Sequence, residues 1–134
     1  MKTFYCIGFI CILFAACNKD NNSAQNKVVG NWELRTSIGG IAGTINYPAG
    51  NGNIYTFYSD GTYHYGFDNL ARTGTYTLTP VANRNTWMLE LHYNVNNQPV
   101  NSMDSVSIDN SKLIFIARET CCDMPTITYE KLGK

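Results

Sequence analysis

Short runs rich in Tyr, Thr, Val, Ile and Phe recur along the chain from Val28 onward, and turn residues close each run. Such runs, bounded by Gly, Asn, Asp or Pro, are typical of β-strands. No ten-residue stretch here has an apolar stripe of helical period without also containing a turn residue. We therefore predict an all-β fold with strands at residues 28–36, 54–58, 62–67, 73–79, 86–93, 100–108, 112–119 and 126–132.

Most links between these runs are too short for the dozen or more residues that a parallel crossover needs. Neighbouring strands should therefore pair antiparallel in chain order. Eight strands in this order predict an up-and-down barrel, with room inside for side chains or one small ligand. An open sandwich is the alternative. The long link at 37–53 is rich in Gly, Ile and Ala, and we expect it to form a lid over the barrel mouth.

Aromatic and apolar residues share one face on two of the predicted strands, although the sequence cannot say which face points inward. The candidate ligand-binding residues are Tyr63, Tyr65, Phe67, Trp87 and Leu89. These side chains could line a cavity for a small apolar ligand, or they could pack against one another across strands, and we favour packing. Asp104 could anchor a ligand inside the barrel or lie exposed at its rim, and we favour the rim.

Four sequence motifs carry a resemblance to a known family. The run VGNWEL at 29–34 resembles the opening Gly-x-Trp strand of lipocalins. With TFYSDGTY at 56–63, TGTYTL at 73–78 and ITYEKL at 127–132, the chain is similar to the lipocalin-like domain of small Bacteroidetes-type lipoproteins. The resemblance implies a calycin-like barrel in which Gly30 and Trp32 are structural residues at the closed end. It implies no particular ligand, and the chain shows no long helix of the kind that packs beside lipocalin barrels.

The N-terminus has the layout of a secretory signal peptide. Lys2 precedes an uncharged apolar run at 4–16, which is shorter than the roughly 20 residues of a membrane-spanning helix. Ala15 and Ala16 before Cys17 resemble a bacterial lipobox, which implies cleavage after residue 16 and acyl chains such as palmitate on Cys17. A cleaved signal that leaves Cys17 as a free thiol is the alternative.

Three segments follow from this interpretation: a signal peptide at 1–16, a lipidated Cys17 with a flexible tether at 17–27, and a barrel domain at 28–134. Residues 18–27 contain no large apolar side chain, so this stretch cannot bury enough surface to order itself. We expect the protein in the cell envelope, anchored to the outer membrane on its periplasmic or surface-exposed side.

Residues suited to catalysis are few. The chain has two histidines, His64 and His92, on different predicted strands, and it lacks a nucleophile elbow, a phosphate-binding glycine loop and zinc-type cysteine spacing. We expect no enzymatic activity, no cofactor and no metal. Cys121 and Cys122 could form a vicinal disulfide, bond to another chain or remain free thiols; a redox or metal-binding role is a less favoured alternative.

The formal net charge is zero, so no basic field exists to hold nucleic acid. Two hypotheses remain for the function. In the first, the barrel is a non-enzymatic binder of a small apolar ligand. In the second, it is a packed scaffold or interaction module that contacts a protein or glycan at the cell envelope, with the protein partner unspecified.

Overall fold

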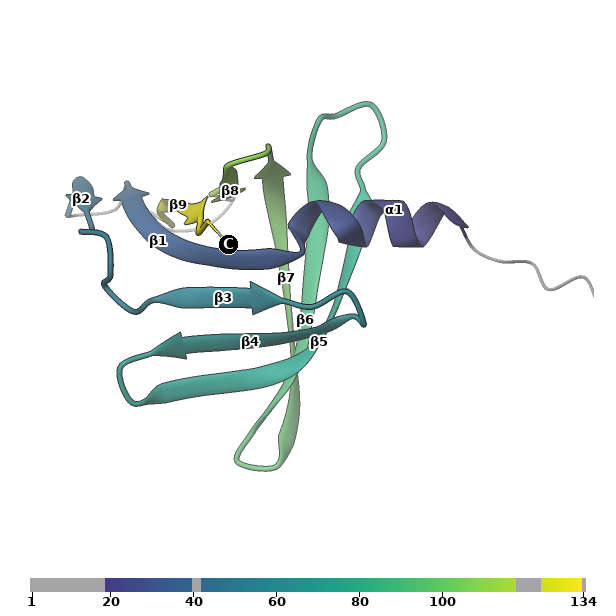
Figure 1. Ribbon diagram of the computed structural model, residues 1–134, viewed down its shortest axis with the longest axis horizontal. Helices are drawn as coiled ribbons and strands as arrows, with labels where there is room; N and C mark the ends of the chain where they lie inside the picture. Colours follow the sequence, from purple (N-terminus) through teal and green to yellow (C-terminus); the bar gives the residue numbers. More distant parts are fainter. Residues whose placement is uncertain (1–18, 40–41, 118–123, 134) are drawn as a thin grey trace, which may run out of the picture.

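The computed structural model describes residues 19–39, 42–117 and 124–133. These residues form one helix and nine strands (Figure 1): α1 Lys19–Val28, β1 Gly30–Ile38, β2 Thr44–Asn46, β3 Ile54–Phe57, β4 Thr62–Phe67, β5 Leu70–Pro80, β6 Trp87–Val95, β7 Gln98–Ile108, β8 Lys112–Phe115 and β9 Thr126–Lys131. All pairings are antiparallel, in the order β1-β3-β4-β5-β6-β7-β8-β9, and β9 pairs back with β1. The predicted eight-stranded barrel is confirmed, and the closing pair excludes the open sandwich.

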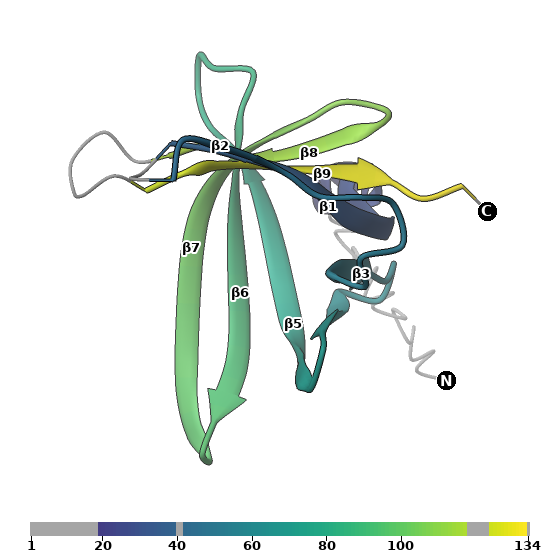
Figure 2. The same cartoon turned by 90° about the vertical axis from the view of Figure 1, so that its left-hand side faces the viewer.

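The barrel is strongly twisted. In Figure 2, strands β5, β6 and β7 descend steeply from the level of β1, β8 and β9, and the β6–β7 hairpin reaches farthest. Its strands pair as far as Val95 and Gln98, beyond the ends predicted at residues 93 and 100. The turn consists of Asn96 and Asn97, which both have positive φ (50° and 62°). Asparagine tolerates this conformation, so two residues suffice to reverse the chain.

The link at 37–53 differs from the predicted lid. Residues 36–38 extend β1, and Thr36–Ile38 pair with Asn46–Thr44 of β2. The segment that follows β2 is held against β1, because the Asn51 side chain donates to the Leu34 carbonyl (2.8 Å) and the Leu34 amide donates to the Asn53 carbonyl (3.0 Å). The described part of this link therefore adds a strand and a loop along the edge of β1.

Glu33 holds this loop from the outer side of β1. Its side chain is only 3% exposed and accepts hydrogen bonds from the Gly50 and Gly52 amides and from Arg35. Burial alone would raise the pKa of Glu33, but these hydrogen bonds outweigh burial and hold the pKa below its ordinary value. The ionised carboxylate thus fixes the loop next to the barrel wall.

Of the irregular tether that we expected at residues 17–27, the described part, from residue 19 onward, belongs to helix α1. Ala24 and Val28, four residues apart and so on one helix face, are buried against the barrel. The Trp32 indole N–H donates to the Val28 carbonyl (2.6 Å) and joins the helix to β1. This segment gains order from docking rather than from its own helix propensity, and the folded domain begins before Val28.

The barrel end that carries α1, hereafter the helix end, is packed solid. Seven side chains of the barrel core are less than 2% exposed: Val28, Trp32, Phe57, Tyr76, Leu89, Val106 and Leu113. The Tyr76 hydroxyl donates to the Tyr58 carbonyl (2.8 Å), which satisfies the one polar group on that ring.

Candidate functional site

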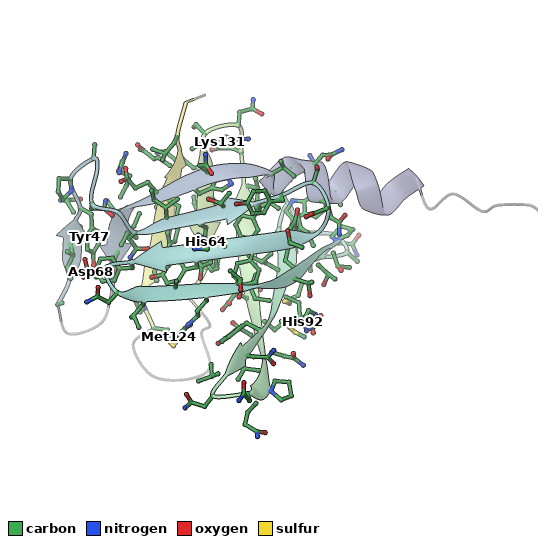
Figure 3. The ribbon with its side chains drawn as sticks, turned by 60° about the horizontal axis from the view of Figure 1, so that its bottom comes forward. Tyr47, His64, Asp68, His92, Met124 and Lys131 are labelled. Atoms are coloured by element: carbon green, nitrogen blue, oxygen red, sulfur yellow. The ribbon has the colours of Figure 1, made fainter. Side chains whose placement is uncertain are left out.

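A cavity of about 200 Å³ lies at the barrel end opposite α1. It is lined by Tyr55, Asp104, Phe115, Ile116, Ala117, Met124, Pro125, Ile127 and Tyr129, and we call it the mouth cavity. Strand β1 runs from Gly30, beside α1, to Ile38, and Ile127 pairs with Ser37 near the far end of that strand. Figure 3 shows Met124 at the lower edge of the barrel, away from the helix.

Three aromatic rings form one wall of the mouth cavity. The Tyr55 ring stacks on Phe115 with centroids 5.9 Å apart and meets the edge of Tyr129 at 5.3 Å. Phe115 and Tyr129 are 5.6 Å apart. Behind this wall, Tyr65 approaches Tyr55 to 4.5 Å. Rings at these separations attract one another and hold the wall in a defined shape.

Strand register brings these side chains together. Phe115 of β8 pairs with Ile127 of β9, and Leu113 pairs with Tyr129. Because side chains alternate along a strand, these four residues all point inward. Phe115 also pairs with Val106 of β7, two residues from Asp104, so Asp104 shares the same interior face.

Burial keeps the tyrosine hydroxyls of the cavity protonated. It raises the pKa of Tyr55 far above the ordinary value of 10, and the neighbouring Tyr65, Tyr63 and Asp104 add to the effect. Burial likewise raises the pKa of Tyr129, with further contributions from Tyr55 and Tyr65. Neutral phenols can donate and accept hydrogen bonds, but they do not provide a base near pH 7.

Asp104 brings a carboxylate to the mouth cavity. It is half-buried, and the Ser102 hydroxyl donates to its Oδ2 atom at 2.9 Å. Within the part of the chain that the structure describes, no ion pair involves Asp104. The sequence favoured an exposed position at the rim, whereas Asp104 is half-buried and lines the mouth cavity; its role as a ligand anchor stays a prediction.

The five predicted ligand-binding residues do not line the mouth cavity. Tyr63 and Leu89 are buried in the packed core, at 2% and 0% exposure. Trp87 lies at the helix end, where the Lys27 ammonium is 5.4 Å from its ring centroid. Tyr65 reaches the site only through its contact with Tyr55, and Phe67 pairs with Leu70 at the β4–β5 turn.

Sequence reasoning missed most of the residues that do line the cavity. A signal for them exists in the alternation of Leu113 with Phe115 and of Ile127 with Tyr129. The two strands that carry them pair directly as β8 and β9, but the cavity also needs Tyr55 of β3 and Asp104 of β7, so the shared wall could not be read from these two strands alone.

Gly30 and Trp32 lie at the helix end. A side chain at Gly30, whose φ is 135°, would come within 2.7 Å of the Lys131 side chain. Trp32 is fully buried, and the Lys131 ammonium lies 5.0 Å from its ring centroid. The absence of a side chain at Gly30 leaves room for Lys131 of β9, and the Trp32 ring provides the surface on which the Lys131 ammonium rests.

The remaining candidates do not line the mouth cavity, although His92 borders a hollow of about 290 Å³ between β5, β6 and β7. His64 and His92 lie on β4 and β6, and His92 Nδ1 is 2.9 Å from Asn101 Oδ1. No group of three His, Cys, Asp or Glu side chains that could hold a metal occurs among residues 19–39, 42–117 and 124–133. Cys17, Cys121 and Cys122 lie outside the described residues.

A larger hollow of about 510 Å³ lies outside the barrel, between α1 and the end of β9. It is lined by Asn26, Val29, Gly30, Asn31, Lys131, Leu132 and Gly133. No aromatic ring or carboxylate lines it, so it offers little to orient a ligand.

Within the described residues, the single helix is neither long nor apolar enough to cross a bilayer. Comparison of the chain with protein-family models, with curated proteins and with solved structures gives no match. The site is therefore defined by its geometry: an aromatic cavity with one carboxylate, at the end of a closed eight-stranded barrel.

Proposed function

We propose that this protein is a non-enzymatic binding protein that holds one small, largely apolar molecule in the mouth cavity. The observation that carries the proposal is the wall formed by Tyr55, Phe115 and Tyr129 inside the barrel. Concave apolar sites with a few polar groups are the usual form of a ligand pocket. The closed antiparallel barrel is compatible with this role.

The size of the cavity restricts the ligand. Its volume of about 200 Å³ lies below the roughly 300–1,000 Å³ of pockets for drug-sized ligands. The barrel interior at the helix end offers no additional room, because residues such as Trp32, Phe57 and Leu89 fill it. The ligand is therefore about the size of one ring with a short substituent.

We propose binding rather than catalysis because of what the lining offers. General acid–base catalysis at neutral pH needs a group with a pKa near 7, and the two lining tyrosines are shifted away from that range. The third polar group among the described lining residues is a single carboxylate, Asp104. This arrangement orients a bound molecule.

Uptake of a small aromatic probe, with a variant that fills the cavity, tests the proposal. The mature chain with Cys17→Ser should bind a single-ring probe such as toluene, detected by ligand-observed NMR. Ala117→Phe places a ring in the cavity lining and should abolish binding. Ala71→Phe, at an exposed position on β5, adds the same ring elsewhere and serves as the control. Binding that survives Ala117→Phe would refute the mouth cavity as the site.

We also propose that Cys17 carries a lipid anchor, as expected of a lipoprotein of the Bacteroidetes lipocalin-like type, and that the protein lies at the outer membrane. Helix α1 leads into β1 at the end opposite the mouth cavity (Figure 1). An anchor upstream of α1 would therefore leave the cavity facing away from the bilayer. Full-length protein should partition into detergent, and Cys17→Ser should move it to the aqueous phase; equal partitioning of both proteins would refute the anchor.

The second candidate function is an interaction module, favoured by apolar side chains exposed around the mouth. Ile38, Ile45, Ile116 and Met124 are 37–56% exposed. Single apolar residues are normal on surfaces, but a group of four at one barrel end is of the kind that partner proteins bury. Ile38→Glu, at an exposed residue outside the cavity lining, should abolish capture of a specific envelope partner while leaving probe uptake intact if this alternative holds.

A further inference from the structure

We propose that the ligand of the mouth cavity carries a positively charged nitrogen that binds Asp104, so that the ligand class is a small aryl-alkyl amine rather than a neutral hydrocarbon. This inference rests on the proposed function. It specifies the chemistry of the ligand from Asp104, the one charged side chain among the described residues that line the cavity.

Asp104 is prepared to receive a cation. Ser102 donates one hydrogen bond to Oδ2, and a carboxylate has room for several more donors. None of the described Lys, Arg or His side chains forms an ion pair with it. Arg72 is exposed, pairs with Tyr65 across β4 and β5, and lies with its guanidinium 5.2 Å from the Tyr93 ring centroid. Its charge lowers the pKa of Tyr55 but is outweighed there by burial.

The aromatic wall complements the carboxylate. An ammonium group gains energy when it lies within about 6 Å of an aromatic centroid, and tyrosine is a suitable partner. The negative charge of Asp104 contributes to the raised pKa of the Tyr55 hydroxyl. A cation bound to Asp104 therefore meets the Tyr55 ring, while the apolar part of the ligand rests on Phe115 and Tyr129.

Neutral ligands of the same shape are disfavoured by the same residue. A neutral molecule that fills the cavity removes water from Asp104 and supplies no charge in return, which leaves a polar group without compensation. Selectivity thus comes from a favourable contact with the amine and a penalty for its neutral analogue. The cavity volume of about 200 Å³ limits the amine to one ring and a short chain.

The test compares phenethylamine with 2-phenylethanol, which has the same shape and no charge at pH 7. Affinities are measured by NMR titration of the mature chain with Cys17→Ser. We expect the amine to bind about tenfold more tightly than the alcohol, and Asp104→Asn to reduce this preference to about twofold or less. Asp68→Asn removes the same charge from an exposed turn where φ is 49°, which asparagine tolerates, and should keep the preference.

The possible outcomes separate this inference from the proposed function. If the parent protein binds both probes equally, the amine preference is refuted and the binding function stands. If neither probe binds to folded protein, both proposals fail. Arg118 follows the cavity residue Ala117 and lies outside the described residues, so Arg118→Gln is included. A preference that appears only in Arg118→Gln would show that the chain supplies its own cation, and would refute the inference.

Discussion

The two ends of the barrel follow the same strand geometry and differ in what fills them. At the helix end, α1 docks through Ala24 and Val28, and Trp32 joins it to β1 by a hydrogen bond. At the mouth, the inward positions hold aromatic rings and Asp104 around a cavity. Inward alternation alone therefore does not make a binding site. A cavity forms where the inward side chains leave space, and at the mouth the charge of Asp104 adds a group that could orient a ligand.

The difference also separates stability from function. Close packing at the helix end contributes stability because every buried methylene there has partner atoms on all sides. Rings at the mouth face empty space on one side and contribute less. Substitutions at the helix end should therefore mainly lower the free energy of unfolding. Substitutions at the mouth should mainly weaken the proposed ligand binding.

The largest effect is expected from a matched pair of large-to-small substitutions. Trp32→Ala should lower the free energy of unfolding by about 3–5 kcal/mol, because it removes a fully buried ring and a hydrogen bond. Phe115→Ala should cost about 1–2 kcal/mol, less than a fully buried phenylalanine, because its ring borders the cavity. Urea unfolding measures both. Equal losses would remove the distinction between the two ends.

Glu33→Gln should have the next largest effect, about 1.5–3 kcal/mol at pH 7, because charged hydrogen bonds to Gly50, Gly52 and Arg35 are weakened. The folded-state pKa of Glu33 lies below its ordinary 4.5. The contribution of the ionised carboxylate is therefore present above pH 4.5 and is lost as the pH falls through the folded-state pKa. Urea midpoints at pH 7 and pH 3 should differ less in Glu33→Gln than in the parent protein; an unchanged pH dependence would contradict the role of this carboxylate.

Tyr76 should give a smaller effect with the opposite pH dependence. Burial raises the pKa of Tyr76 to about 12, with a further contribution from Asp60. The neutral ring therefore contributes stability below pH 10, and this contribution is lost as the pH rises from 10 to about 12. Tyr76→Phe should cost about 0.5–1.5 kcal/mol at pH 7 through loss of the bond to Tyr58, and should reduce the alkaline sensitivity of unfolding. Tyrosinate absorbance followed against pH provides the measurement.

The smallest effect on stability is expected from Asp104→Asn, within about 0.5 kcal/mol, because the residue is half-buried and forms no ion pair with the described residues. The same variant should have a large effect on amine binding. A strong destabilisation in urea would instead indicate that Asp104 stabilises the fold. It would contradict the expectation that mouth residues contribute little to stability.

Much of the fold could be predicted from local pattern. The runs at 62–67 and 112–119 were predicted as strands because β-branched and aromatic residues fit a pleated, half-buried surface; the first is β4, and the second contains the shorter β8 at Lys112–Phe115. Two elements could not be predicted. Strand β2 has three exposed residues with no apolar period, and it exists because the edge of β1 is free to pair there. Helix α1 buries only Ala24 and Val28 among its described side chains, too few for a periodic signal.

The candidate site was harder to predict than the fold. Sequence placed Tyr63 and Leu89 each on an apolar strand face but could not say which face points inward; the structure buries both in the packed core. Whether an inward residue meets a neighbour or a cavity depends on residues brought together from β3, β7, β8 and β9. Asp104 is an example: the sequence showed which residues share its strand face, but not that this face borders a cavity.

The sequence by itself determined the strands, their antiparallel order and the alternation of inward and outward residues, because these follow from interactions between near neighbours and from short links. The tertiary structure decided the closure of β1 on β9, the docking of α1 and the gathering of Tyr55, Asp104, Phe115 and Tyr129 around one cavity. These features depend on contacts between residues far apart in the chain. Their geometry is set by the register and twist of the whole barrel, which no single segment encodes.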